Sequence, residues 1–373
     1  MLVSVVAWLF LDALNVAPNR IVPGTPYTSL EVMGGWPALL LGLPLLGVAV
    51  LAWQPSRKGL QCSLAVVVAV LMLLPLWLAA ATVGFVDADA PQARVGIGSA
   101  LWLLLFLLLL AVIELRTRLG VSRAKGWLLF MPMLASWWLA LTLWLEPLAL
   151  VREYRVRSDQ FASAVYTHLM LVGAAVGVSL LLAAVLVLVM RRQPAVRRIG
   201  FAALNFLQTI PSLALFGLLL APLAWLGSRI DWLGNMGVSG IGWAPAFLAL
   251  LGYSLLPMVR NIFVALEEVD AGVIESARGM GMSRRQVFVQ VRLPLALPVV
   301  LEGVRITTIQ AIGLTAVAAL IGAGGLGTFI FQGLGQAAMD MVLLGALPII
   351  ALALVADALI GALSERLRLG GAQ

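Results

Sequence analysis

The chain has 373 residues, of which 62% belong to the set AVILMFWYC and only 11% are charged. This composition excludes an ordinary soluble globular domain and predicts that a lipid bilayer surrounds most of the chain. The formal charge is +7, but the basic residues lie in short clusters between apolar runs. That pattern is typical of cytoplasmic loops beside anionic lipids, and it argues against nucleic acid as a partner.

Ten apolar stretches are candidates for membrane-spanning helices, each of which needs roughly 20 residues. They cover residues 2–17, 36–53, 60–83, 97–114, 126–145, 165–190, 201–226, 244–264, 295–321 and 341–362. Their continuous apolar character favours helices over the alternating strands of a β-barrel. We therefore predict an all-α, polytopic membrane protein of about ten spans. The first stretch is interpreted as a short helix and not as a signal peptide, because it lacks a basic n-region and contains Asp12.

Lys and Arg gather in the even-numbered connections between these stretches and in the C-terminal tail, which predicts that both termini are cytoplasmic. The fifth connection is an exception. It holds Arg152, Arg155 and Arg157 as well as Glu146, Glu153 and Asp159. We assign it to the outside only because the neighbouring connections leave no other choice.

The same connection, Glu146 to Gln160, is a long polar stretch and predicts a domain boundary. We predict an N-terminal accessory membrane region of about five spans at residues 1–160 and a second membrane region at residues 161–373. No internal repeat relates the two halves, which argues against the inverted-repeat architecture of many secondary transporters. The first half offers no chemical motif.

Few residues are available for catalysis or metal binding. Cys62 is the single cysteine, so an intrachain disulfide and a cysteine-based metal cluster are excluded. The single histidine, His168, lies in an apolar stretch, where a hydrogen-bonded interior side chain is favoured over a ligand or proton relay. We predict no catalytic residue, no metal site and no bound cofactor.

The segment Glu267 to Pro298 reads EEVDAGVIESARGMGMSRRQVFVQVRLPLALP. It predicts a helix ending near Arg278, a turn at Gly279 to Gly281, and a second short amphipathic helix capped by Ser283. Pro294 is expected to stop this helix and redirect the chain into the next span. Five apolar side chains would face water without a partner: Met280, Met282, Val287, Phe288 and Val291. A rigid knob that fits a soluble partner is therefore favoured over a solvated connector.

This segment resembles the cytoplasmic loop of the membrane subunits of binding-protein-dependent ABC importers. Their signature is EAA, three residues, Gly, nine residues, Ile, one residue, Leu-Pro. The chain matches both gaps with Glu275, Ser276 and Ala277, then Gly281, then Val291, Leu293 and Pro294. It departs from the signature at Ser276 and Val291. The resemblance implies a coupling loop at residues 266–294 that docks in a cleft of a separate ATPase. The residues implied are Glu275, Ala277, Arg278, Gly279, Gly281, Met282, Ser283, Arg284, Leu293 and Pro294.

Two further stretches, LNFLQTIPSLALFGLL at 204–219 and AALIGAGGLGTFIFQGL at 318–334, look like permeases of the osmoprotectant subgroup. APNRIV at 17–22 resembles a branch of that subgroup with extra N-terminal spans. The resemblance implies a five-helix permease core in a bacterial inner membrane that imports glycine betaine or a related quaternary amine. It also implies a second permease chain, two ATPase subunits and an extracytoplasmic binding protein. ATP and Mg²⁺ would be bound by the ATPase, because neither Lys58 nor Lys125 lies in a Walker loop.

Polar residues and a proline interrupt the predicted span 201–226. Such a break is equally compatible with a pathway lining and with a kink satisfied by neighbouring helices. The candidate pathway residues are Gln208, Pro211, Ser212, Gln310 and Gly324. The G-x-G-x-x-G pattern at Gly322, Gly324 and Gly327 follows no predicted strand, so a glycine-rich break in the permease wall is favoured over a dinucleotide site. The G-x-x-x-G pattern at Gly173 and Gly177 predicts close helix packing.

Ionisable residues inside the spans leave two alternatives to the ABC permease open. Glu302 and Arg305 are three residues apart on one helix, so a structural pair is favoured over a transport role, while Asp12 and Asp357 have no predicted partner. A secondary transporter driven by ions through Asp357, Glu302 or Asp12 is the leading alternative. An intramembrane enzyme is a third, opposed by the lack of a Ser, His or metal-ligand constellation.

Overall fold

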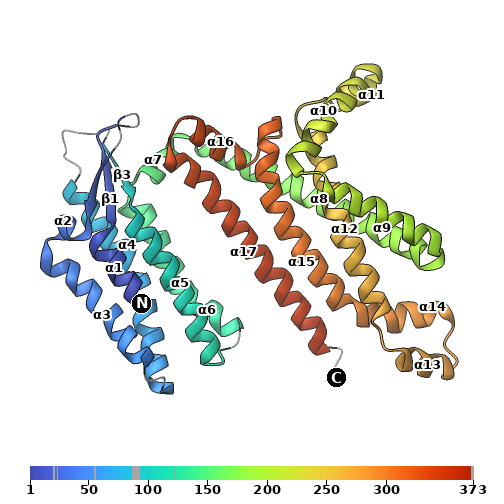
Figure 1. Ribbon diagram of the computed structural model, residues 1–373, viewed down its shortest axis with the longest axis horizontal. Helices are drawn as coiled ribbons and strands as arrows, with labels where there is room; N and C mark the ends of the chain where they lie inside the picture. The colour runs from blue at the N-terminus through green and yellow to red at the C-terminus, as the bar shows by residue number, and fades with distance from the viewer. Residues whose placement is uncertain (20–21, 23, 54–55, 86–92, 122, 371–373) are drawn as a thin grey trace. The chain divides into compact units, whose positions relative to one another are not determined.

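The computed structural model describes residues 1–19, 22, 24–53, 56–85, 93–121 and 123–370. The chain divides into two compact units, Met1–Val156 and Arg157–Gln373. Each unit is a bundle of long apolar helices joined by short connections (Figure 1).

Seven helices of the described residues are long and apolar enough to cross a membrane. They are Arg57–Thr82, Ser99–Arg118, Ser158–Arg192, Ser212–Arg229, Trp243–Glu267, Arg284–Ile321 and Met339–Leu367. Two shorter apolar helices, Gly42–Leu51 and Phe130–Leu143, lie in further predicted spans. The fold is thus that of a polytopic, predominantly α-helical membrane protein, with fewer candidate spans than the ten that the apolar stretches predict.

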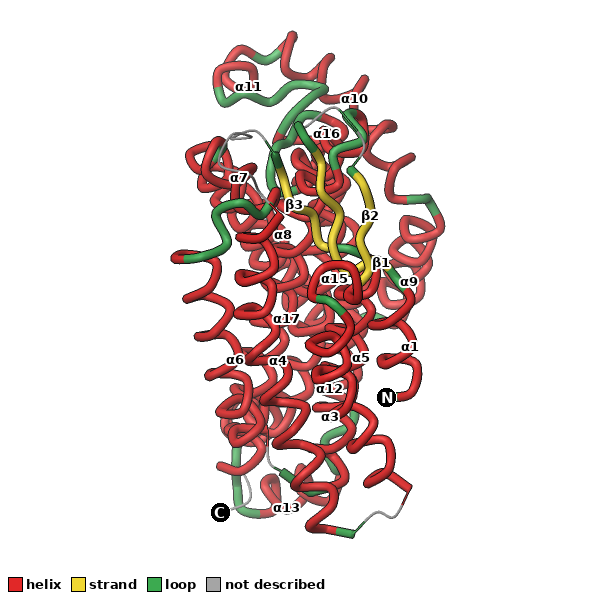
Figure 2. The backbone as a smooth tube through the Cα atoms, turned by 90° about the vertical axis from the view of Figure 1, so that its left-hand side faces the viewer, coloured by secondary structure: helices red, strands yellow, loops and turns green. Residues whose placement is uncertain are grey.

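The first unit combines helices with a small sheet. Its elements are α1 Leu2–Phe10, β1 Asp12–Ala17, β2 Thr25–Thr28, α2 Ser29–Met33, α3 Gly35–Trp53, α4 Arg57–Phe85, β3 Arg94–Ile97, α5 Ser99–Arg118, α6 Arg123–Leu143 and α7 Ala149–Val156. The sheet has the order β2-β1-β3 and is antiparallel throughout, and its three strands lie side by side in Figure 2. The all-α class that the sequence predicts is confirmed, and this small sheet is an addition within the first unit.

The prediction of one span over residues 2–17 is wrong. Helix α1 ends at Phe10 and is about 13 Å long, less than half of the roughly 30 Å hydrocarbon core. The polar side chains of Asp12 and Asn15 disfavour a lipid-embedded helix here, and the chain instead forms β1 between β2 and β3. Trp8 fixes the short helix: it is fully buried and its indole Nε1 donates to Ala38 O at 2.9 Å.

The part of the basic fifth connection up to Val156 lies beside this sheet in the first unit. Arg94 of β3 forms an ion pair with the buried Glu153 of α7 at 2.5 Å, and Arg155 pairs with Glu146 at 2.5 Å. Arg152 Nη1 donates to Ala93 O at 2.6 Å. Arg152 and Arg155 of this connection are therefore engaged by a carbonyl and a carboxylate of their own unit.

The second unit is built on four long helices and a broken one. Its elements are α8 Ser158–Arg192, α9 Pro194–Thr209, α10 Ser212–Arg229, α11 Asp231–Asn235, α12 Trp243–Glu267, α13 Ala271–Gly279, α14 Arg284–Gln286, the π-helix η1 Val287–Arg292, α15 Leu293–Ala318, the 3-10 turn η2 Ala319–Ile321, α16 Gly327–Gly335 and α17 Met339–Gly370. The interruption predicted inside the span 201–226 is confirmed, because the chain leaves the helix between Thr209 and Ser212.

Two other expectations have opposite outcomes. His168 is fully buried and its Nε2 lies 3.1 Å from Ile312 O, which confirms an interior, hydrogen-bonded histidine. Gly173 and Gly177, in contrast, are exposed, and a Cβ built on either would meet nothing within 4 Å. Among the residues that the structure describes, the expected close packing at this G-x-x-x-G pattern is therefore not made.

Candidate functional site

The loop between α12 and α15 forms a compact helical element at one end of the second unit. It consists of α13, α14 and η1 and lies at the lower right of Figure 1, at the opposite end of α12 and α15 from α11 and α16. At its start, Glu267 forms an ion pair with Arg191 at 3.2 Å, which ties the end of α12 to the end of α8. The loop is therefore anchored to two long helices where it begins.

Helix α13 begins at a side-chain cap and ends in a glycine turn. Asp270 Oδ1 accepts from Val273 N at 3.1 Å. At the other end, Met282 N donates to Ala277 O at 3.2 Å and Gly281 N donates to Arg278 O at 2.9 Å. These two bonds, with Gly281 at φ 84°, make a Schellman motif. Because only glycine adopts that φ without strain, the turn explains why glycine occupies position 281.

The second helix starts two residues later with reciprocal caps. Ser283 N donates to Gln286 Oε1 at 2.8 Å, and Gln286 N donates to Ser283 Oγ at 3.4 Å. This capping box satisfies two amide groups that the helix itself leaves without acceptors. The cap predicted at Ser283 is confirmed. A Schellman turn followed directly by a capping box leaves little freedom between the two helices.

Pro294 does not stop the second helix, so that prediction is wrong. The helical chain runs from Arg284 to Ile321 without interruption, and Pro294 lies in the first turn of α15. The reason is the π-helix that precedes it, in which Leu293 N donates to Phe288 O, five residues back. A π-turn widens the helix, which accommodates a proline ring and its missing N–H. The loop is thus joined rigidly to α15.

The loop has a small hydrophobic core of its own. Ile274, Ala277 and Val287 are buried, with Met282 and Val291 packed against them. The expectation that Val287 faces water is therefore wrong. Met280 at the turn is 77% exposed. Val273, Met280 and Val289 remain exposed for a partner, and the buried alanine explains why a small residue occupies position 277.

The remaining implied coupling residues are exposed on the loop. They are Glu275, Arg278, Gly279, Gly281, Ser283, Arg284, Leu293 and Pro294. Glu275 and Arg278 lie on α13, one helical turn apart, and Arg284 begins α14. The structure thus brings together the acidic, basic and glycine positions of the sequence signature on one protruding element.

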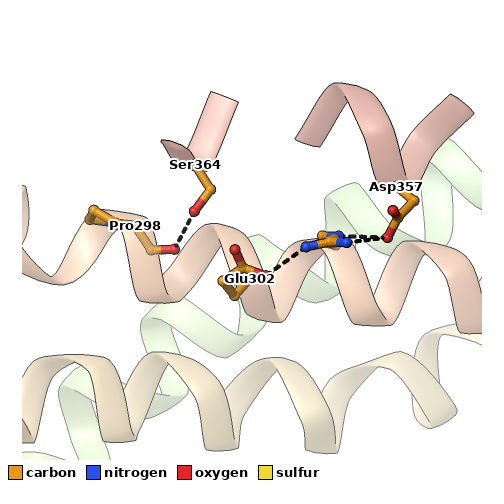
Figure 3. Close-up of polar contacts among 5 residues, drawn as sticks. Pro298, Glu302, Asp357 and Ser364 are labelled. Atoms are coloured by element: carbon orange, nitrogen blue, oxygen red, sulfur yellow. Dashed lines mark hydrogen bonds and ion pairs between the residues drawn. The ribbon is translucent and has the colours of Figure 1, made fainter. Parts of the chain in front are cut away.

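A charged cluster connects α15 with α17. Arg305 Nε donates to Asp357 Oδ1 at 2.6 Å, and Arg305 Nη1 donates to Glu302 Oε2 at 3.2 Å. One helical turn nearer the loop, Ser364 Oγ donates to Pro298 O at 3.2 Å. Figure 3 shows Glu302 and Pro298 on α15 facing Asp357 and Ser364 of α17. The expected pair of Glu302 and Arg305 is confirmed, and Asp357 has a partner that its sequence position did not indicate.

The break between α9 and α10 is held by α12. Gln208 Nε2 donates to Tyr253 O at 2.9 Å, and the Tyr253 hydroxyl donates to Ile210 O. Pro211 directly precedes the first residue of α10, Ser212. The backbone carbonyl freed by the break therefore has a donor, as expected for a kink satisfied by a neighbouring helix.

Removing the hydroxyl that caps this break gives a testable consequence. The Tyr253→Phe variant leaves Ile210 O without its donor, so we expect a loss of about 1 kcal/mol in the free energy of unfolding. Denaturant titration of the purified protein measures it. Tyr166→Phe is the matched control, because this side chain is 65% exposed. The control should leave the free energy of unfolding unchanged. Equal stability of both variants would show that the hydroxyl does not hold the break.

The glycine-rich segment after α15 is a turn and not a nucleotide loop. It follows α15 and η2, and Gly322, Gly324 and Gly325 have φ values of 76°, 77° and 81°. A Cβ at Gly327 would approach Ala316 O to 1.9 Å, so α16 packs closely on α15. The interpretation of this pattern as a break where helices pack is supported by these backbone angles.

The pathway candidates are distributed over three elements. Gln208, Pro211 and Ser212 flank the break, Gln310 is exposed on α15, and Gly324 lies in the glycine-rich turn. Side chains around the break and around the turn border one apolar cluster that includes Tyr253 and Ala323. The structure therefore brings the break and the turn to the same region of the unit.

The sequence of this unit matches a known family. The family model described as "Binding-protein-dependent transport system inner membrane component" covers residues 175–369. The chain belongs to this family. Residues 1–151 match a second model, described as "ABC transporter permease YehY, N-terminal domain". The chain is therefore the inner-membrane permease component of an ABC importer, and it carries a region similar to that N-terminal domain.

Individual relatives align with most of their own length. The permease is 34% identical to the carnitine transport permease protein OpuCB of Listeria monocytogenes over 59% of this chain and 93% of the relative. It is 39% identical to the osmoprotectant import permease protein OsmW of Salmonella typhimurium over 52% and 86%. Among solved structures, an inward-facing MetNI methionine ABC transporter matches with 25% identity and a TM-score of 0.47, over 57% of this chain and 97% of the other.

In this family, solute translocation and ATP hydrolysis belong to different subunits. Permeases of this family are multi-pass proteins of the inner membrane that bind no cofactor and leave ATP hydrolysis to a separate subunit. They work with an ATPase and with another permease chain. The permease is thus a non-enzymatic part of a larger transporter.

Proposed function

We propose that the permease imports a small quaternary amine of the glycine betaine class and that ATP hydrolysis on a partner subunit drives it through alternating access. The observation that carries the substrate class is the similarity to carnitine and osmoprotectant permeases over most of their length. The transporter would contain two ATPase subunits, which bind ATP and Mg²⁺, and a second permease chain. An extracytoplasmic binding protein would select the solute.

Coupling is proposed to act through the loop at residues 266–294. Met282 to Gln286 would contact the ATPase, with the exposed tip at Met280, and Glu275 and Arg278 would orient α13. The rigid turn at Gly281 and the continuous helix from Arg284 to Ile321 support this proposal. Because no flexible segment separates the tip from α15, movement of the ATPase surface would be transmitted to that span.

The solute pathway is proposed to pass near the broken helix and the glycine-rich turn. Gln208, Pro211, Ser212, Gln310 and Gly324 are its candidate residues. The break at Pro211 and the positive φ of Gly324 support it, since irregular backbone at membrane depth is tolerated where it borders protein or a cavity. The bond from Gln208 to Tyr253 O gives that residue a structural role as well.

The topology is proposed from charge. We place the coupling loop and the C-terminus in the cytoplasm, with five spans in the core: α8, the α9–α10 pair, α12, α15 and α17. The ion pair of Arg155 with Glu146 supports the assignment of the fifth connection to the outside, because it offsets one of the arginines there. The N-terminus is assigned to the cytoplasm by counting residues 2–17 as a span. Because α1 ends at Phe10, these residues are not one span, and the assignment of the N-terminus no longer follows from the count.

We further propose that residues 1–160 are an accessory membrane region and that residues 161–373 are the permease core. The match of residues 1–151 to a separate N-terminal domain supports a boundary near the polar connection. The compact unit Met1–Val156 has its own hydrophobic core and its own sheet. These features support an independently packed region attached to the core.

Uptake by proteoliposomes that contain the permease, its ATPase and the binding protein tests the function. We expect uptake of labelled glycine betaine only with enclosed ATP, competed by unlabelled choline or carnitine and not by methionine. Collapse of the proton and sodium gradients should leave the rate unchanged. Gradient-dependent uptake without the ATPase would instead identify a secondary transporter. Absence of ATP-dependent uptake of glycine betaine, choline and carnitine would reject the substrate class and leave the ABC permease assignment intact.

A further inference from the structure

A pocket lined by arginines lies between the end of α8 and the coupling loop. Its volume is about 720 Å³. Six arginines line it: Arg191, Arg192, Arg278, Arg284, Arg285 and Arg292. A single carboxylate, Glu267, is in the lining, and it is paired with Arg191 at 3.2 Å. The pocket therefore carries a strong excess of positive charge.

The excess positive charge of the pocket favours the binding of an anion. Guanidinium groups that share one pocket repel one another unless an opposite charge lies between them. Arg292 gives an independent indication, because its Nε is buried and has no hydrogen-bond acceptor among the described residues. A buried donor of a cation without an acceptor is costly. The planar fork of arginine donors fits the oxygens of a phosphate better than those of most other anions.

The position of the pocket indicates where that phosphate comes from. Arg191 and Arg192 form the last turn of α8, a 35-residue helix, after its apolar run. Arg292 directly precedes the apolar helix α15, whereas Arg284 and Arg285 lie about two helical turns farther from it. In the proposed topology, arginines that directly flank an apolar run lie near the depth of the cytoplasmic lipid headgroups. The pocket therefore extends from this depth toward the coupling loop.

The lining also contains apolar side chains. Leu188, Ile274, Val287 and Phe288 contribute to the same pocket as the arginines. A free phosphate ion uses no apolar surface, whereas a glycerophospholipid has a phosphate next to its glycerol and the first acyl carbons. Basic pockets beside transmembrane helices are typical binding sites for anionic headgroups. We propose that this pocket binds the phosphate of an anionic phospholipid, which lies between α8 and the coupling loop.

A lipid titration of the full-length permease, purified in detergent, tests the site by native mass spectrometry. Phosphatidylglycerol should bind more tightly than phosphatidylcholine with the same acyl chains. The Arg192→Gln and Arg292→Gln variants should each weaken phosphatidylglycerol binding by about fivefold. Arg198→Gln is the matched control, because this exposed arginine on α9 does not line the pocket. Arg192 is exposed, so its variant is expected to fold normally even if the Arg292 variant does not.

Equal affinity for the two lipids, or equal phosphatidylglycerol affinity in Arg192→Gln and in the Arg198→Gln control, would overturn the proposal. A separate experiment with inorganic phosphate distinguishes a lipid headgroup from a free anion. If millimolar phosphate displaces phosphatidylglycerol and raises the melting temperature of the delipidated wild type but not of Arg192→Gln, the site takes a free anion and the lipid assignment fails. Neither Arg192 nor Arg292 belongs to the proposed ATPase contact, so this result is separable from failure of the coupling proposal.

Discussion

Replacement of Gly281 by valine is expected to abolish ATP-driven solute uptake while the permease remains in the membrane. Gly281 has φ 84° and donates the second bond of the Schellman motif. A β-branched residue held at such a φ costs about 1–3 kcal/mol, which is enough to open the turn between α13 and α14. The tip at Met280 would then lose its fixed position relative to α15. Uptake by proteoliposomes and the amount of ATPase that copurifies with the permease measure the effect.

Gly335→Ala is the matched control, because Gly335 is the last residue of α16, lies outside the coupling loop, and a Cβ there meets nothing within 4 Å. Alanine is favoured over glycine in a helix by roughly 1 kcal/mol, so this variant should transport as the wild type does. Gly281→Asn should keep partial activity, since asparagine tolerates the left-handed region better than valine. If Gly281→Val takes up solute at the wild-type rate, the turn has no mechanical role in coupling.

The features of the coupling loop that sequence predicted are those set by neighbouring residues. The cap at Ser283 needs only Gln286 three residues later, and the turn at Gly281 needs only backbone groups of α13. Such bonds form whatever the rest of the chain does. The route through Pro294 was missed because a proline normally ends a helix, and the π-turn that accommodates it has no sequence signature as clear as a capping box.

Features that depend on distant residues could not be predicted in the same way. Arg305 and Asp357 are 52 positions apart, and Tyr253 and Ile210 are 43 apart. Only the packing of α15 on α17 and of α12 on the break brings them together. The first predicted span failed for a related reason, since β1 is stabilised by β2 and by the distant β3. The 16 apolar-rich positions alone resembled a short helix, although Asp12 and Asn15 interrupt them.

Arg305→Gln is expected to lower the stability of the second unit by about 2 kcal/mol. Breaking a fully buried ion pair costs more, but the side chains of Arg305, Glu302 and Asp357 keep 21%, 31% and 39% of their exposure. The variant leaves the carboxylates of Glu302 and Asp357 close together without their shared cation. Asp357→Asn should cost less, because Arg305 retains Glu302 as a partner. Denaturant titration in detergent, with Arg198→Gln as the surface control, measures both changes.

The double variant Arg305→Gln with Asp357→Asn separates a structural link from a transport group. If the pair joins α15 to α17, the cost of the double variant should fall short of the sum of the single costs by about 1 kcal/mol or more. Uptake should then decline in step with stability. If Asp357→Asn instead keeps its stability and abolishes uptake, Asp357 acts in transport. Wild-type uptake that falls when the proton gradient is collapsed would then favour the ion-driven mechanism, because the pair would exchange a proton during the cycle.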